Sequence, residues 1–279
     1  MQTIFILAAL LLATSSTAPA TPSTPELVPL AGAVNDFNPS LTADGATLYF
    51  VRSKLDWTAP HIFVAHRTAA GWSAPERISF TDDRWSDSDV AISPDGRTLY
   101  FVSNRPTGAR PEHKDYDLFV ATQTDGKWSE PRPLEGASSP KQEFGPDVHG
   151  GWLYFNSLRE GGSGKSDVYR ARLHDDGTVD APENLGTPVN SALGEFDPFV
   201  TADGKRMYLS IRERPDGFGE ADLYVATWDG AHWSEPRNLG AGVNSPKYDN
   251  CPFVAGDGKT LWFSSTRDGA SRIYRMAIE

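Results

Sequence analysis

Five similar hydrophobic triplets at a regular spacing constrain this chain more than any other feature of its sequence. Their third residues stand at positions 50, 101, 155, 209 and 263, so the spacings are 51, 54, 54 and 54 residues. A period of this length is typical of an architecture in which one supersecondary unit recurs. The triplets are Leu48-Tyr49-Phe50, Leu99-Tyr100-Phe101, Leu153-Tyr154-Phe155, Met207-Tyr208-Leu209 and Leu261-Trp262-Phe263.

A two-residue turn signal precedes each triplet. Glycine accepts positive φ and aspartate can bond to the turn backbone, so Asp-Gly between apolar runs indicates a hairpin. The turns are Asp44-Gly45, Asp95-Gly96, Gly150-Gly151, Asp203-Gly204 and Asp257-Gly258. Upstream of each turn we expect another short strand, opened in four repeats by a proline and in the second by Val90. The prolines are Pro39, Pro146, Pro198 and Pro252.

Two more strands complete each unit. A third apolar stretch follows every triplet, at residues 62–64, 118–120, 168–170, 223–225 and 273–275. A Trp-Ser-x-Pro phrase then begins at Trp72, Trp128 and Trp233, with a weaker version at 179–182. Proline is tolerated in edge strands, where its missing N–H need not pair. Each repeat therefore predicts a four-stranded sheet.

Four-stranded units of about 50 residues, repeated around a ring, are typical of a β-propeller. We predict an all-β propeller of about five blades, with repeats at 36–80, 87–135, 143–187, 195–241 and 249–279. The last repeat lacks a fourth strand, and residues 25–30 resemble the fourth strand of the preceding repeat. We therefore expect this N-terminal segment to complete the last blade and close the ring, within one domain spanning 21–279.

The N-terminus carries the signature of export. Residues 4–13 form an apolar run of ten residues, too short to span a bilayer, and Ala18-Pro19-Ala20 fits a signal-peptidase site. We predict a signal peptide at 1–20 and a periplasmic or secreted protein that is not inserted in a membrane. Cys251 is the only cysteine, so no intramolecular disulfide can form and core packing must hold the fold.

The net charge of −11 makes nucleic acids poor candidate partners, because an acidic chain repels phosphates. No G-x-S-x-G, H-E-x-x-H or C-x-x-C motif occurs. We expect no cofactor and a monomeric protein.

The repeat resembles that of a known protein family. The pattern acidic-x-x-Pro, Asp-Gly, Leu-Tyr-Phe-x-Ser-x-Arg, Asp-Leu-Tyr and Trp-Ser-x-Pro-x-Asn-Leu-Gly resembles the WD-like propeller repeat of TolB-type periplasmic proteins. Its clearest instances are residues 101–105 and 233–240. The resemblance implies a propeller of the cell envelope that binds other proteins or envelope components.

Three series of charged residues recur at equivalent positions, and we expect all three near one mouth of the channel. Converging carboxylates would favour a ligand site, whereas pairing with arginines would tie the loops together. The first series precedes the first strand: Asp36, Asp87, Glu143, Glu195 and Asp249. The second follows the second strand: Lys54, Arg105, Arg159, Arg212 (or Arg214) and Arg267. The third opens the third strand: Asp117, Asp167 and Asp222. We interpret the last two series as structural ion pairs.

Positions that depart from the repeat are further site candidates, because a specific site breaks symmetry. His61 and Arg272 stand where other repeats carry aspartate, and Asp89 is added beside Asp87. Aromatic and polar residues of the second repeat accompany them, namely Trp85, His113, Lys114 and Tyr116. Aromatic rings beside carboxylates are typical of a carbohydrate or peptide cleft.

Three functions remain open. We favour a non-catalytic binding module for an envelope protein, a peptide or a glycan at the channel mouth. The alternative is a glycoside hydrolase that uses carboxylates of the first series. A metal site in the channel is the third possibility, supported only by the acidic ring.

Overall fold

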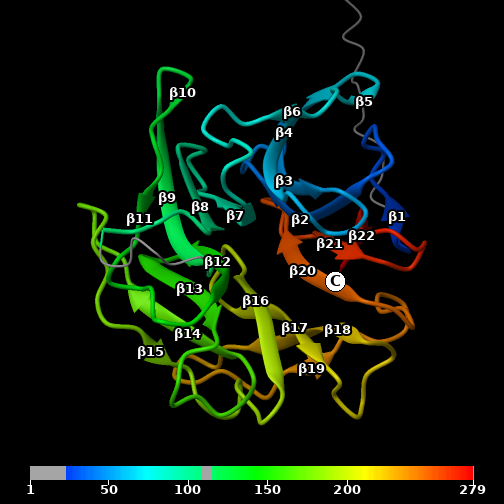
Figure 1. Cartoon of the computed structure of the whole chain (residues 1–279). Coiled ribbons are helices and arrows are strands. Elements are labelled where there is room, and N and C mark those ends of the chain that lie inside the picture. Colours follow the sequence, from blue (N-terminus) through cyan, green and yellow to red (C-terminus); the bar gives the residue numbers. More distant parts are fainter. Residues whose placement is uncertain (1–22, 109–114, 279) are drawn as a thin grey trace, which may run out of the picture.

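The computed structural model describes residues 23–108 and 115–278, which fold into five antiparallel sheets around a central axis (Figure 1). The first blade contains β2 (Asn35–Leu41), β3 (Thr47–Ser53), β4 (His61–Thr68), β5 (Gly71–Trp72) and β6 (Glu76–Arg77). The second contains β7 (Asp87–Ile92), β8 (Thr98–Ser103), β9 (Asp117–Thr124), β10 (Lys127–Trp128) and β11 (Arg132–Pro133).

The remaining blades follow the same order. The third contains β12 (Glu143–His149), β13 (Trp152–Ser157), β14 (Asp167–Arg172) and β15 (Glu183–Asn184). The fourth contains β16 (Gly194–Val200), β17 (Arg206–Arg212), β18 (Ala221–Thr227) and β19 (Arg237–Asn238). The fifth contains β20 (Asp249–Val254), β21 (Thr260–Ser265), β22 (Arg272–Ala277) and β1 (Glu26–Leu27). The prediction of an all-β propeller with five blades is confirmed.

Strand β1 closes the ring as predicted. It pairs antiparallel with β22, where Glu26 lies opposite Arg275 and Leu27 opposite Tyr274. Val28, just beyond this strand, is 3% exposed and packs with Trp262 and Ile273. The first and last parts of the propeller are therefore joined by hydrogen bonds and by a shared apolar cluster.

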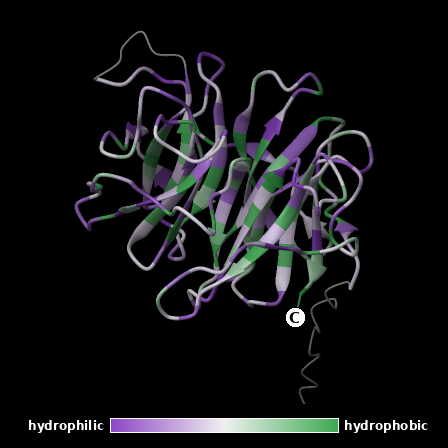
Figure 2. Cartoon of the chain, turned by 90° about the horizontal axis from the view of Figure 1, so that it is seen from below, coloured by the Kyte–Doolittle hydropathy of each residue, from purple (hydrophilic) through white to green (hydrophobic). Residues whose placement is uncertain are grey.

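The hydrophobic triplets fill the interfaces between blades. Because side chains alternate along a strand, Leu99 and Phe101 pack toward the first blade while Tyr100 packs toward the third. The other triplets divide in the same way, and the described residues contain one apolar cluster for each pair of neighbouring blades. Figure 2 shows hydrophobic residues concentrated along the strands and hydrophilic residues in the loops. Both faces of every blade are thus buried.

The Asp-Gly turns form as expected. The carboxylates of Asp44, Asp95 and Asp203 each accept a bond from the backbone N–H two residues later, at 2.9–3.0 Å. The following glycines, Gly45 and Gly96 among them, have φ near +70° (+65° and +72°). These turns set the register of the first hairpin in each blade.

The prolines lie differently from the expectation that they open the inner strand. The inner strands β2, β12, β16 and β20 begin three or four residues earlier, and each proline directly follows a bulged residue with positive φ. The ladder is interrupted at the bulge, so the missing proline N–H costs no hydrogen bond there. The inner strands lie next to one another around the axis.

The predicted signal peptide at 1–20 lies outside the described residues. In the part of the chain that the structure describes, no helix of a length and hydropathy able to cross a membrane is present.

Ring closure can be tested with two adjacent residues of the N-terminal segment. Val28 is buried, whereas Leu27 is 45% exposed. We expect Val28→Asp to lower the free energy of unfolding by about 3 kcal/mol, because it buries a charge, and Leu27→Asp to lower it by less than about 1 kcal/mol. Urea denaturation followed by tryptophan fluorescence measures both. Equal effects of the two substitutions would contradict a closing role for this segment.

Candidate functional site

The acidic residues that begin the inner strands are bound mainly by arginines. Arg52 donates to Asp36 from two nitrogens, at 2.7 and 2.9 Å, and Arg105 binds both carboxylate oxygens of Asp87. Arg159 bonds to Glu143 at 3.2 Å and Arg267 to Asp249 at 2.8 Å. All four carboxylates are nearly or fully buried. In the first blade the partner is Arg52 instead of the expected Lys54, because Arg52 lies directly opposite Asp36 in the β2–β3 pair.

The same arginines also hold the segments that lead into their blades. Arg52 donates to the carbonyl of Ala31 at 2.8 Å, and Arg105 donates to that of Phe80 at 3.0 Å. Arg159 and Arg267 bond in the same way to the carbonyls of Ala137 and Val243, at 2.6 and 2.7 Å. Each arginine therefore joins an inner strand to the chain entering that blade.

The fourth blade departs from this arrangement. Ile211 lies opposite Glu195 in the β16–β17 pair, at the place of the serine or arginine found in other blades. Glu195 is fully buried, accepts a 2.5 Å bond from the Ser191 hydroxyl, and has one oxygen without a hydrogen-bond partner. Burial raises the pKa of this carboxyl. Arg212, which was expected with Arg214 as an alternative to form the structural ion pair of this blade, follows Ile211 along β17 and lines the axial pocket described below.

Two members of the third series, Asp167 and Asp222, are bound by backbone amides and not by the expected arginines. Asp167 accepts bonds from the backbone N–H groups of Ser163 and Gly164, at 2.5 and 3.0 Å, and Asp222 accepts one from Phe218 at 2.7 Å. The loops after β13 and β17 curl back over these carboxylates, so backbone amides take the place that arginines were expected to fill. Asp117 is fully buried at the equivalent position of the second blade.

The described residues that depart from the repeat pattern do not lie together in one site. His61 is 6% exposed and lies 3.4 Å from Asp83, and Arg272 donates to the backbone carbonyls of Val34 and Ser271. Neither lines the axial pocket described below. His113 and Lys114 lie outside the described residues. Of the predicted ligand-site residues that the structure describes, Asp89 alone lines the pocket.

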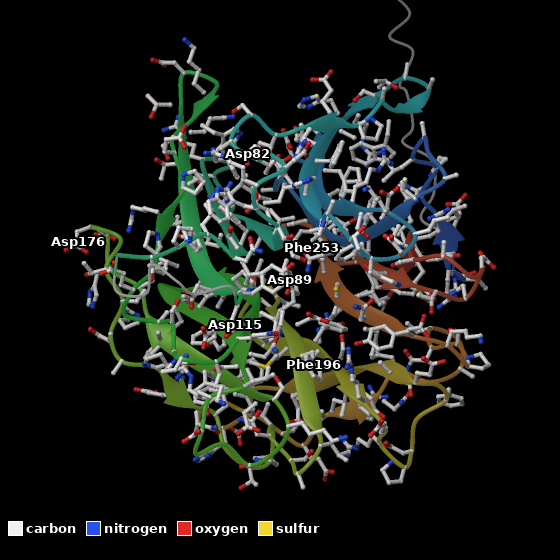
Figure 3. The ribbon with its side chains drawn as sticks, in the orientation of Figure 1. Asp82, Asp89, Asp115, Asp176, Phe196 and Phe253 are labelled. Atoms are coloured by element: carbon white, nitrogen blue, oxygen red, sulfur yellow. The ribbon has the colours of Figure 1, made fainter. Side chains whose placement is uncertain are left out.

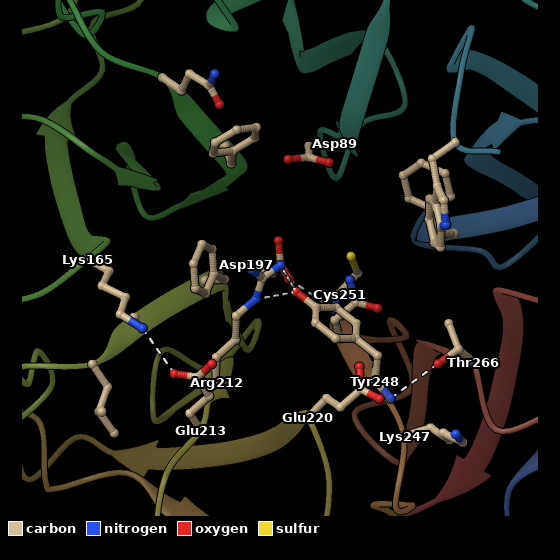
Figure 4. Close-up of a pocket in the computed structure, with 18 of the residues that line it drawn as sticks. Asp89, Lys165, Asp197, Arg212, Glu213, Glu220, Lys247, Tyr248, Cys251 and Thr266 are labelled. Atoms are coloured by element: carbon tan, nitrogen blue, oxygen red, sulfur yellow. Dashed lines mark hydrogen bonds and ion pairs between the residues drawn. The ribbon is translucent and has the colours of Figure 1, made fainter.

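A pocket of about 920 Å³ opens on the propeller axis (Figure 4). Asp89 and Phe196 lie near the centre of the molecule, whereas Asp82 and Asp176 lie toward its edge (Figure 3). Aromatic rings and charged side chains of several blades line the pocket. The aromatic residues are Phe37, Trp57, Phe144, Phe196 and Tyr248, and the charged ones are Asp89, Lys165, Asp197, Arg212, Glu213, Glu220 and Lys247.

The bulged residues of the inner strands separate this pocket from the next cavity on the axis, and Asp89, Asp197 and Cys251 form the floor of the pocket. The bulged residues are Asn38, Asp89, Gly145, Asp197 and Cys251, with φ between +49° and +55°. A Cβ atom on Gly145 would lie 2.8 Å from the Cα of Asp197, so this position has room only for glycine. Below the floor a second cavity of about 30 Å³ continues along the axis. Five equivalent bulges thus close the channel at one level.

Two carboxylates dominate this floor. Asp89 accepts a 3.0 Å bond from the backbone N–H of Gly145 and a 2.9 Å bond from the Ser88 hydroxyl. Asp197 accepts bonds from the backbone N–H of Cys251 at 3.2 Å and from the Ser210 hydroxyl at 3.1 Å. Neither forms an ion pair with a cation in residues 23–108 or 115–278. They differ in this respect from four of the five acids that begin the inner strands.

The two carboxylates hold a proton more tightly than exposed aspartates do. Burial, and then the negative charge of Asp197, raise the pKa of Asp89 to about 7. Burial also raises the pKa of Asp197, and the nearby Arg212 guanidinium partly opposes this increase.

Trp57 stands out at the rim. Its side chain is 53% exposed, its φ is +65°, and its ring contacts that of Phe37 with centroids 5.6 Å apart. A bulky residue at positive φ is uncommon, and such conformations gather at ligand sites. The loop after β3 thus presents an indole to solvent at the pocket mouth.

Within residues 23–108 and 115–278, no group of three or more His, Cys, Asp or Glu side chains is placed to hold a metal ion. The acids of the first series point to arginines, serines and loop amides, so their recurrence does not by itself create a cation site.

Asp197, Trp57 and Arg212 were not predicted as pocket residues. Asp197 follows Glu195 by two residues, as Asp89 follows Asp87, so aligning the repeats at that position would have found it. Arg212 stands one residue earlier than Arg159 and Arg267 do in their repeats, and this shift was the available signal. The strained conformation of Trp57 leaves no mark in the sequence.

Comparison with solved structures finds propellers of two kinds. TolB from Acinetobacter baumannii is 16% identical, with a TM-score of 0.52; the match covers 90% of this chain and 56% of that one. A glycoside hydrolase is 13% identical, with a TM-score of 0.65 and coverage of 92% and 91%. The family-43 endo-arabinanase of Bacillus licheniformis is 15% identical, with a TM-score of 0.62 and coverage of 90% and 96%. No family model and no curated protein matches.

These likenesses establish the five-bladed propeller and nothing finer, because function resides in sites and not in the fold. The chain spans about half (56%) of the length of the Acinetobacter TolB.

The contrast between Arg267 and Arg212 can be measured. We expect Arg267→Met to lower the free energy of unfolding by about 3–5 kcal/mol, because it leaves the buried Asp249 carboxylate without its cation. Arg212→Met should lower it by less than about 1 kcal/mol, because Arg212 is exposed and forms no ion pair with a described carboxylate. Urea denaturation at pH 7 measures both. Similar losses would contradict the distinction between the fourth blade and its neighbours.

The raised pKa of Asp89 predicts a pH effect. The folded state binds the proton more tightly than the unfolded state, so ionising Asp89 costs stability as pH rises from about 4 to about 7. Asp89→Asn removes this cost. The free energy of unfolding of the variant minus that of the wild type should rise by up to about 4 kcal/mol between pH 4 and pH 8.

Urea denaturation across this pH range tests the effect, with Asp176→Asn as the matched control. Asp176 is exposed and its pKa is lowered by the Thr178 hydroxyl, so the control should show no such rise. Parallel pH profiles for wild type and Asp89→Asn would show that the pKa of Asp89 is not raised in the folded protein.

Proposed function

We propose that this protein is an exported, TolB-like propeller that binds a glycan in its axial pocket, without chemical conversion. The observation that carries the proposal is the composition of the pocket. Exposed or half-buried aromatic rings form its wall and rim, and two carboxylates without a cation partner among the described residues form its floor. Pockets that bind small molecules combine apolar walls with a few well-placed polar groups.

The chemistry of a sugar suits both parts of this pocket. Its hydroxyl groups donate to carboxylate oxygens, and its C–H faces pack against aromatic rings. A concave pocket of about 920 Å³ has the size of a small-molecule site. An envelope protein or a peptide would use the same mouth, and these partners are the alternative outcomes of the experiment below.

Export supports an encounter with glycans outside the cytoplasm. The apolar run at 4–13 and the Ala18-Pro19-Ala20 sequence are the basis for this part of the proposal. The chain cannot form an intramolecular disulfide. This is compatible with export, because each blade interface supplies an apolar cluster that can hold the fold.

Glycoside hydrolysis is the second candidate function. It is favoured by the two carboxylates that share the floor of the pocket, since hydrolysis uses a pair of carboxyl groups, one that donates a proton and one that is ionised. Burial raises the pKa of both groups, to about 7 for Asp89. The hydrolases with a similar fold add the general precedent that such propellers can carry this chemistry.

Binding can be tested with two exposed residues of one loop. Calorimetric titration with a panel of oligosaccharides should identify a ligand, and we expect Trp57→Ala to weaken its binding at least tenfold through loss of the indole surface. Leu55→Ala is the control, because Leu55 is 59% exposed and does not line the pocket. Asp89→Asn should weaken binding to a similar extent as Trp57→Ala.

The outcomes separate the candidates. Equal binding by wild type and Trp57→Ala, or binding of peptides alone, would overturn the glycan proposal. The oligosaccharide that the titration identifies is then incubated with the wild type, Asp89→Asn and Asp197→Asn, and the reducing ends formed are measured. Turnover by the wild type that both variants lose would replace the binding function with hydrolysis.

A further inference from the structure

Among the described residues, Arg212 of the fourth blade is the only arginine that lines the pocket. Equivalent residues at the end of the second strand line the pocket in three blades. They are Leu158 in the third blade, Arg212 in the fourth and Thr266 in the fifth. The next position, which holds Arg159 and Arg267 in the third and fifth blades, is Glu213 in the fourth. The fourth blade therefore loses the ion pair to its inner-strand acid and gains a cation in the pocket wall.

The Arg212 guanidinium is held in a defined plane. Its carbon lies 4.7 Å from the centroid of the Phe196 ring and 4.8 Å from that of the Tyr248 ring. Its Nε donates to the Tyr248 hydroxyl at 2.6 Å, and its Nη2 donates to the same oxygen. Two aromatic rings and one hydroxyl thus fix the orientation of the group, and its remaining donors lie on the edge formed by Nη1 and Nη2.

That edge has no carboxylate partner in the described parts of the chain, although Arg212 lines the pocket and is exposed. Lys165 and Lys247 stand on the same wall, and Lys165 is paired with Glu213 at 3.0 Å (Figure 4). Of the three cations that line the pocket in the described residues, Arg212 and Lys247 form no ion pair there, and a cation without a paired carboxylate favours an anionic ligand group.

We infer that Arg212 binds a carboxylate of the ligand, so that the glycan recognised by this protein contains a uronic acid. The inference rests on the proposed function. A guanidinium edge offers two parallel N–H groups, which match the two oxygens of a carboxylate. Asp197 lies near Arg212 (Figure 4), but its carboxylate accepts bonds from the Cys251 backbone N–H and the Ser210 hydroxyl and forms no ion pair with Arg212, so the guanidinium edge remains open to a ligand.

The experiment uses oligosaccharides of galacturonic, glucuronic and mannuronic acid, each compared with its methyl ester. Esterification removes the charge and leaves the ring stereochemistry unchanged. Calorimetric titration of the full mature protein should show at least tenfold tighter binding of one acid than of its ester. Arg212→Met should reduce the affinity for the acid at least tenfold and change the affinity for the ester less than twofold.

Two further variants separate a direct contact from a general effect. Arg212→Lys keeps the charge and loses the planar edge, so its affinity for the acid should fall between those of wild type and Arg212→Met. Arg214→Met is the matched control, because Arg214 lies two residues beyond Arg212 but bonds to Glu235 and the Pro236 carbonyl, outside the pocket. It should bind the acid as the wild type does. Thermal melting of all variants verifies that they are folded.

The results distinguish the two proposals. If the wild type binds acid and ester equally, or if Arg212→Met weakens both equally, the role of Arg212 is overturned while glycan binding stands. If no saccharide of either kind binds, and neutral oligosaccharides also fail, the proposed function is overturned and the uronic acid with it.

Discussion

The structure depends on the burial of both faces of every blade. A single four-stranded sheet of this protein exposes an apolar surface on each side, and only a neighbour on each side covers both. Leu48 and Phe50 therefore pack toward the fifth blade, while Tyr49 and Val51 pack toward the second. This requirement forces the sheets into a closed ring, since an open array would leave two faces in water. The ring in turn produces an axis, and the axis is where a pocket can form without weakening any blade interface.

Buried ion pairs add a second level of order to the ring. The arginines of four blades bind an inner-strand acid and a backbone carbonyl of the incoming chain, so they fix how each blade meets the axis. A buried pair of this kind is costly to break and contributes little net stability when intact, and its value lies in specifying one arrangement. The fourth blade lacks this ion pair at Glu195. The Arg212 side chain binds no inner-strand acid, so it is available to a ligand.

Much of the fold follows from local patterns that are visible in the sequence. Triplets such as Leu99-Tyr100-Phe101, with a turn before and a strand after, define the repeat, and the resemblance of residues 25–30 to an outer strand reveals the closure. The site was harder to predict because it depends on backbone geometry. The bulge turns Asp89 and Asp197 toward the axis while Asp87 and Glu195, two residues earlier, stay buried in the blades. Side chains two residues apart lie on the same face of a regular strand, so without the bulge Asp87 and Asp89 would share one face, as would Glu195 and Asp197. Trp57 likewise owes its position to a positive φ that composition does not encode.

The five bulges have a consequence for how such a protein can change. Four of the bulged residues carry a side chain, and these already differ, as asparagine, aspartate, aspartate and cysteine, whereas the fifth is Gly145. The carboxylates of Asp89 and Asp197 accept bonds from backbone N–H groups of other blades, and none of the bulged residues belongs to the apolar clusters between blades. Substitutions at these four positions can alter the chemistry of the floor while the scaffold stays the same. The axis thus offers four positions that can change beside one glycine that cannot, and a propeller of this kind can acquire new ligands without having to evolve a new fold.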